Sequence, residues 1–153
     1  MPKFSETSLE KLSECHQDLQ TLFKYVIEYF DCTIVFGHRT PEEQFELFKK
    51  GRKEIYGTWV IKDSSKVVTF RDGMNKKSKH NEYPSLAVDC APYPTLYGEP
   101  DAVRHFSGYV LGMADILYHL GHIENRIISG SDWDNDRDLK DQKFYDPLHF
   151  EIA

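Results

Sequence analysis

Apolar residues recur every three or four positions in two long stretches of the chain. This spacing predicts one long amphipathic helix from Ser5 to Phe30 and a second from about Asp101 to Leu120. Gly121, directly after the second stretch, suits a C-terminal helix cap. A shorter helix is predicted from Thr40 to Lys50, because the Thr-Pro-Glu-Glu at its start has the pattern of a capping box.

Short runs rich in β-branched and aromatic residues predict strands between these helices. They lie at Cys32–Phe36, Thr58–Ile61, Lys66–Phe70, Leu86–Ala91, Ile127–Ile128 and His149–Ile152. Helices and strands in this order favour an α+β fold, with a small, mostly antiparallel sheet and helices on one face. The chain has no linker, internal repeat or low-complexity segment, so residues 1–153 are expected to form a single domain.

The composition, 40% hydrophobic and 29% charged over 153 residues, is typical of a globular domain with one core. The formal net charge of −6 argues against a nucleic acid partner held through its phosphates. No apolar run reaches the roughly 18 to 20 residues that cross a bilayer, and the first residues lack the apolar segment of a secretory signal. We therefore expect a chain that is made in the cytoplasm and does not insert into a membrane. Cys15, Cys32 and Cys90 are odd in number and form no Cys-x-x-Cys pair, which favours buried free thiols.

Asp89 stands in an apolar run that is predicted to be a strand. Burying a carboxylate there costs several kcal/mol unless a partner compensates its charge. A metal ion is one such partner, and an arginine is another. His80 precedes Asp89 by nine residues and is a candidate ligand if the partner is a metal.

His149 offers a second nitrogen ligand near the end of the chain. On a strand, alternation places His149 and Glu151 on one face and Phe150 on the other, and Asp146 lies three residues before His149. A catalytic zinc takes three protein ligands of the His and carboxylate types and keeps one place for water. Two histidines, one buried aspartate and one spare carboxylate as general base fit this pattern. Spacing alone leaves open the alternative that these histidines are structural.

Three groups of residues carry a resemblance to a known family. They are Gly37-His38-Arg39 with Gln44, then Ser78-x-His80 with Ala87-x-Asp89, then Asp132-Trp133 with Asp146-x-x-His149-Phe150-Glu151. In this order, over nearly the whole chain, they resemble the zinc peptidases of the D-alanyl-D-alanine carboxypeptidase family. That family includes vancomycin-resistance dipeptidases and phage endolysins that cut the L-alanyl-D-glutamate bond of peptidoglycan.

The resemblance implies a fold of the Hedgehog and DD-peptidase type and a zinc centre. It makes His80, Asp89 and His149 the Zn²⁺ ligands. Asp146 matches the general base, which takes a proton from a zinc-bound water that attacks the peptide carbonyl.

The resemblance also assigns residues to the substrate. Arg39 matches an arginine that faces the substrate and stabilises the oxyanion, a task suited to a fixed cation with several donors. Ser78 and Trp133 match positions near the site, with a hydrogen-bonding and a wall-forming role. Gln44 matches a recurrent position as well, although it could equally anchor its helix to the preceding turn.

The chain departs from the family pattern at two places. The link between His80 and Asp89, residues 81–86, is two residues longer than in the best-known form of the motif. We interpret it as a loop variant, which affects substrate contacts near Tyr83. His38 stands where an aromatic or apolar residue is common, and a surface histidine is favoured there over a second proton-transfer group.

Among members of the family, the single-domain phage endolysins resemble this chain most. We expect one catalytic domain over residues 1–153, without a separate cell-wall-binding domain, which acts as a monomer on the peptidoglycan stem peptide. It would reach the cell wall in the periplasm after release from the cytoplasm. A D-alanyl-D-alanine carboxypeptidase or dipeptidase shares the same chemistry and is the first alternative. A non-catalytic, zinc-stabilised, Hedgehog-like binding module is the second, although such a module has no use for the spare carboxylate of Asp146.

Two charged segments have less specific interpretations. Acidic residues alternate from Asp132 to Asp138 as in a calcium loop, but Arg137 and Lys143 occupy positions where an EF-hand needs Gly and Glu. A solvated acidic loop is therefore favoured over a Ca²⁺ site. The basic clusters Lys49–Lys53 and Lys76–Lys79 could meet an anionic glycan-peptide or could simply be solvated.

Overall fold

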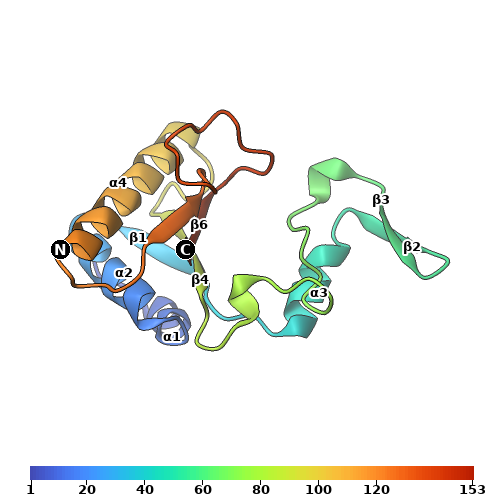
Figure 1. The fold of residues 1–153 in the computed structure, drawn as a ribbon, viewed down its shortest axis with the longest axis horizontal. Coiled ribbons are helices and arrows are strands. Elements are labelled where there is room, and N and C mark those ends of the chain that lie inside the picture. The colour runs from blue at the N-terminus through green and yellow to red at the C-terminus, as the bar shows by residue number, and fades with distance from the viewer.

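A four-stranded antiparallel sheet forms the centre of the structure, a computed structural model that describes residues 1–153 (Figure 1). Its strands are β1 (Cys32–Phe36), β4 (Ala87–Pro92), β6 (Asp146–Ile152) and β5 (Ile127–Gly130), in that spatial order. β2 (Arg52–Ile55) and β3 (Thr58–Ile61) form a separate antiparallel hairpin. The predicted α+β class and the antiparallel sheet are therefore confirmed.

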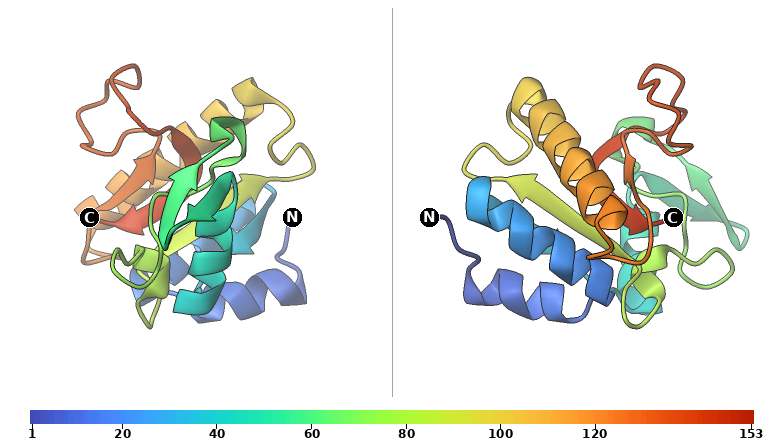
Figure 2. Two further views of the ribbon diagram at one scale, coloured as in Figure 1. Left: turned by 90° about the vertical axis from the view of Figure 1, so that its right-hand side faces the viewer. Right: turned by 60° about the vertical axis from the view of Figure 1, so that its left-hand side comes forward.

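Helices cover one face of the sheet. They are α1 (Glu6–Ser13), α2 (Gln17–Tyr29) and α4 (Pro100–His119). The fourth helix, α3 (Pro41–Lys49), lies with the β2–β3 hairpin on the other side of the molecule, as Figure 2 shows. No helix combines the length and the apolar character that a membrane crossing requires.

The long helix predicted over Ser5–Phe30 is wrong as a single element, because it is two helices with a break between them. At the break the backbone turns aside to bond with a distant segment: the amide of His16 donates to the Ser85 carbonyl at 2.8 Å, and the amide of Ser85 donates to the Glu14 carbonyl at 2.8 Å. Helix periodicity continues across the break, so the apolar pattern alone does not reveal it.

The strand predicted at Lys66–Phe70 is also wrong, since β3 pairs with residues 52–55 instead. Tyr56 and Gly57 have φ values of 48° and 78°, which suits a tight two-residue hairpin turn. Side chains, rather than a neighbouring strand, hold the 66–70 segment in place. The guanidinium of Arg52, for example, donates to the Thr69 carbonyl at 3.0 Å.

The core lies between the sheet and its covering helices. Phe150 of β6 has no exposed surface, and its ring meets Phe23 of α2 and Phe106 of α4 edge to face, with ring centres 5.5 and 6.2 Å apart. Since side chains alternate along a strand, His149 and Glu151 face the opposite side. The three cysteines are free thiols within the core, as predicted.

Removing the Phe150 ring should therefore destabilise the protein strongly. We expect Phe150→Ala to lower the free energy of unfolding by about 3–5 kcal/mol, as for other large core aromatics. Tyr56→Ala, at the fully exposed tip of the β2–β3 hairpin, should change it by less than about 0.5 kcal/mol. Urea unfolding followed by circular dichroism measures both, and equal losses would contradict this account of the core.

Candidate metal centre

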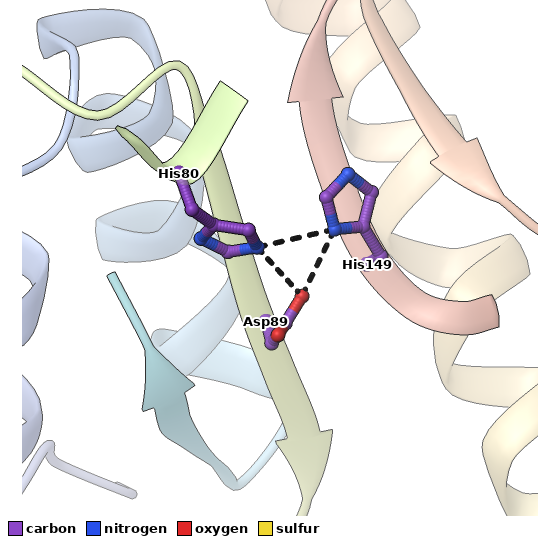
Figure 3. Close-up of side chains that lie close together, drawn as sticks. All are labelled: His80, Asp89 and His149. Atoms are coloured by element: carbon purple, nitrogen blue, oxygen red, sulfur yellow. Dashed lines mark hydrogen bonds and ion pairs between the residues drawn. The ribbon is translucent and has the colours of Figure 1, made fainter. Parts of the chain in front are cut away.

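Three side chains from three separate segments meet on the side of the sheet that faces away from the core (Figure 3). His80 lies on the short 3-10 turn η2 (Lys79–Asn81), Asp89 on β4 and His149 on β6, where Asp89 and His149 are direct cross-strand partners. His80 Nε2 and His149 Nδ1 lie 3.2 and 3.0 Å from Asp89 Oδ1, and 3.3 Å from each other.

The turn that carries His80 is built by capping. The hydroxyl of Ser78 accepts from the amide of His80 at 3.3 Å, and the side-chain oxygen of Asn81 accepts from the amide of Ser78 at 2.8 Å. The amide of Arg39 donates to the His80 carbonyl at 2.8 Å, and Asn81 donates to the Arg39 carbonyl at 3.1 Å. His80 and Arg39 are therefore fixed relative to one another by the backbone.

Outer hydrogen bonds set which nitrogen of each histidine faces the centre. His80 Nδ1 lies 2.7 Å from the Gly37 carbonyl, and His149 Nε2 lies 2.8 Å from a carboxylate oxygen of Glu151. Both partners are acceptors, so we assign the ring protons to these two nitrogens. The neutral rings then direct lone pairs from His80 Nε2 and His149 Nδ1 at the same point as Asp89 Oδ1.

Three converging lone pairs repel one another unless a proton or a metal cation lies among them. Tetrahedral zinc with bonds of about 2.0–2.1 Å places neighbouring ligand atoms about 3.3 Å apart. The observed separations of 3.0–3.3 Å match this spacing, and the outer partners on both histidines are typical of metal ligands. The residues present therefore fit a zinc ion.

Arg39 compensates the other oxygen of Asp89. Its Nη2 lies 2.7 Å from Asp89 Oδ2, and the two side chains are only 10% and 13% exposed. Burial raises the pKa of Asp89, but the charge of His80 and the hydrogen bonds from His149 and His80 outweigh it and hold the pKa well below its usual range. Of the two partners that the sequence offered for Asp89, the arginine is therefore present at Oδ2, while Oδ1 faces the two histidine nitrogens, where a metal ion would fit.

Gln44 lies beneath Arg39 with no exposed surface. Its side-chain oxygen accepts from Arg39 Nη1 at 3.2 Å, and its nitrogen donates to the Thr69 hydroxyl at 3.2 Å and the Arg71 carbonyl at 3.0 Å. This burial favours the anchoring role over direct contact with a substrate. Arg39 Nε is buried and has no hydrogen-bond partner.

Asp146 begins β6 and lies half-buried beside the three converging side chains. Burial and the nearby charge of Asp89 raise its pKa to about 6, against the opposing charges of His149 and Arg39. A carboxylate with such a pKa is suited to accept a proton near neutral pH. Gly130 is required alongside it, since a Cβ at that position would collide with the Asp146 carbonyl.

These groups line a cleft of about 810 Å³ between the sheet and the α3 side of the molecule. Trp133 forms part of its wall, with its ring 5.2 Å from that of His149 and its indole N–H bonded to the Phe144 carbonyl. Ser78 also lines the cleft. The cleft therefore contains every predicted site residue except Gln44.

His38 and Tyr83, singled out from the departures in sequence, do not line this cleft. Their rings meet edge to face with centres 5.2 Å apart, and His38 Nδ1 lies 3.0 Å from the Glu82 carbonyl. The longer 81–86 link is therefore placed away from the candidate site, and His38 is a surface histidine as favoured.

The acidic loop is organised by its own backbone. Asp132 is 1% exposed and accepts from the amides of Asp136 and Arg137 at 3.1 and 3.0 Å, whereas Asp134 and Asp136 are exposed. These hydrogen bonds account for the burial of Asp132 without an ion.

Glu151 and Tyr97 are two cleft residues to which the sequence analysis gave no role. Glu151 fixes the His149 ring and pairs with Lys79, whose Nζ lies 3.2 Å from Glu151 Oε1. The sequence signal for Glu151 was its alternation with His149, which places both side chains on the same face of the predicted strand. Tyr97 also lines the cleft, but it comes from the loop between β4 and α4, where no local pattern marks it.

Comparison with protein families finds that the model for the phage L-alanyl-D-glutamate peptidase family matches residues 1–153. The L-Ala D-Glu endopeptidase ChiX of Serratia marcescens shares this fold, with a TM-score of 0.62 and 18% identity over 99% of this chain and 91% of that chain. The Zn(II) complex of the E175A mutant of VanY, a vancomycin resistance D,D-pentapeptidase from a VanB-type cassette, aligns with a TM-score of 0.49 and 16% identity over 88% of this chain and 68% of that chain. No curated protein sequence matches the chain.

Without a metal ion, His149 takes up a second proton. Burial lowers its pKa, but the hydrogen bonds and charges of Asp89 and Glu151 outweigh burial and raise it to about 9. Because the folded pKa lies above the ordinary value of 6.5, protonation stabilises the fold fully below pH about 6.5, and this stabilisation is lost as the pH rises through about 9. In chelator-treated protein, we expect the free energy of unfolding to fall more steeply across this window in the wild type than in His149→Gln. Parallel pH dependences in urea unfolding would refute this assignment.

Proposed function

The chain belongs to the phage L-alanyl-D-glutamate peptidase family, and from this we propose that it is a zinc-dependent peptidoglycan hydrolase that cuts the L-Ala-D-Glu bond of the stem peptide. One observation carries the zinc assignment. His80 Nε2, Asp89 Oδ1 and His149 Nδ1 converge within 3.0–3.3 Å of one another beside the half-buried carboxylate of Asp146. The proposal includes a single catalytic domain over residues 1–153, which acts as a monomer on the cell wall.

In this proposal His80, Asp89 and His149 hold the zinc ion. Zinc supplies Lewis acidity, which lowers the pKa of water and polarises a carbonyl. The protein prepares the ligands in advance: the Gly37 carbonyl and Glu151 orient the two rings, so little reorganisation is needed on binding.

Asp146 and Arg39 then act on the reacting groups. The pKa of about 6 leaves Asp146 ionised at neutral pH and basic enough to accept the proton of the attacking water. Arg39 is held by Asp89 and Gln44 in the wall of the cleft, which supports its role as a fixed positive charge that faces the developing oxyanion. Trp133 and Ser78 would form the wall against which the peptide lies.

A digest of purified Gram-negative sacculi, with and without a zinc chelator, tests this function. We expect chelator-sensitive release of peptides with a new N-terminal D-Glu, identified by mass spectrometry. Loss of terminal D-Ala alone would transfer the activity to the carboxypeptidase class. Absence of any release by the zinc-loaded protein would favour a binding module.

Asp146→Asn should separate metal binding from catalysis. The amide keeps the size of the side chain but cannot serve as a base, so we expect turnover to fall by about 10²–10⁴-fold while zinc content stays near that of the wild type. His149→Gln is the matched control and should lose both zinc and turnover. Normal turnover by Asp146→Asn, measured with a stem peptide, would exclude it as the base.

Glu151 should affect the metal through His149. Loss of an outer partner of a metal ligand typically weakens binding by about 10–100-fold, so we expect this loss in Glu151→Ala and a smaller one in Glu151→Gln, whose amide oxygen still accepts. Competition with a chromophoric chelator measures the affinity. Glu54→Ala, an exposed carboxylate on β2, is the control, and equal zinc affinity in all variants would show that Glu151 does not orient the ligand.

A further inference from the structure

Positive charge is concentrated in one segment of the chain. Residues 41–79, which we call the basic lobe, contain ten Lys and Arg side chains against six Asp and Glu, whereas the rest of the chain has nine against 19. The basic lobe comprises α3, the β2–β3 hairpin and the loops that lead to η2, which lie together on one side of the molecule (Figures 1 and 2). Its residues form one side of the cleft.

Three cations of the basic lobe line the cleft without a carboxylate partner: Lys50, Arg71 and Lys77. All three side chains are exposed, and none takes part in an ion pair. The other two cations of the cleft, Arg39 and Lys79, are already paired with Asp89 and Glu151. Lys50, Arg71 and Lys77 are therefore the Lys and Arg side chains of the cleft whose positive charge no carboxylate neutralises.

The nearest acid in the sequence does not neutralise them. Asp72 follows Arg71 directly, but its Oδ1 accepts from the amides of Met74, Asn75 and Lys76 at 2.8–2.9 Å. These bonds shape the loop that ends at Lys77. The turn is held against α3, since a Cβ at Gly73, where φ is 78°, would lie 2.8 Å from the Gln44 side chain.

The main chain before the loop is fixed as well, because Gln44 binds the Arg71 carbonyl at 3.0 Å and also holds Arg39. The buried side-chain amide of Gln44 thus fixes both the position of Arg39, which pairs with Asp89, and the backbone that carries Arg71. The backbone at Arg71 is consequently held in a fixed position relative to Arg39 and the candidate metal centre, and such preorganisation favours selective binding over diffuse attraction.

The substrate class named under the proposed function, on which this inference rests, carries the complementary charge. In the stem peptide D-Glu continues through its γ-carboxyl group, so its α-carboxylate is free and lies next to the bond that is cut. We propose that Lys50, Arg71 and Lys77 form a carboxylate-binding wall that recognises this free α-carboxylate and discriminates against its amidated form. Arg71 can donate two parallel hydrogen bonds to a carboxylate, and the lysines add charge.

Two synthetic stem peptides that differ only at this group test the inference, one with the free α-carboxylate of D-Glu and one with the α-amide. For the zinc-loaded wild type, we expect kcat/KM to be at least about tenfold higher for the carboxylate, which is about 1.4 kcal/mol of discrimination. In Arg71→Met and Lys77→Met the ratio of the two values should fall towards one. In the wild type it should also fall with added NaCl, because the cations are exposed.

Lys53→Met is the matched control, since Lys53 is an exposed cation of the basic lobe outside the cleft and should leave the wild-type ratio unchanged. Equal thermal melting of the three variants and the wild type would show that folding is preserved. Two results would overturn the carboxylate-binding wall without contradicting the proposed function. One is cleavage of both peptides at equal rates by the wild type, and the other is an unchanged ratio of the two kcat/KM values in both cleft variants. Cleavage of neither peptide would overturn the two together.

Discussion

The carboxylate of Asp89, largely buried on a central strand, is the constraint on which the rest of the site depends. Its two oxygens face different partners: Oδ1 lies with the nitrogens of His80 and His149, and Oδ2 pairs with Arg39. An aspartate in this position is tolerated only if both oxygens are compensated. The strand pairing that places His149 opposite it, the capped turn of His80 and the Gln44 contact to Arg39 all serve that compensation.

β6 shows how one strand connects stability with chemistry. Phe150 packs between α2 and α4, while its neighbours His149 and Glu151 point to the cleft. Packing of Phe150 fixes the register of β6 against β4, because a slip of one residue would exchange the two faces. The position of His149 opposite Asp89 is therefore secured by the core.

Local pattern was sufficient to predict the α+β class, all four strands of the central sheet in outline, the capped start of α3 and the long helix α4. The proposed zinc ligands and Asp146 were identified because their spacing resembles a motif of the family whose model matches the whole chain. What could not be predicted depends on contacts between distant residues. The break between α1 and α2 is formed by Ser85, and the segment 66–71 is held by Arg52 and Gln44. Glu151 meets Lys79 only when β6 lies beside η2.

The central claim is that three fixed side chains hold one zinc ion through predetermined atoms. Anomalous diffraction at the zinc absorption edge, from crystals of the zinc-loaded protein, tests it most directly. We expect a single strong peak bonded to His80 Nε2, Asp89 Oδ1 and His149 Nδ1, with His149 Nε2 still bound to Glu151. A peak located instead at the acidic loop around Asp132, or bonded to His149 through Nε2, would contradict it.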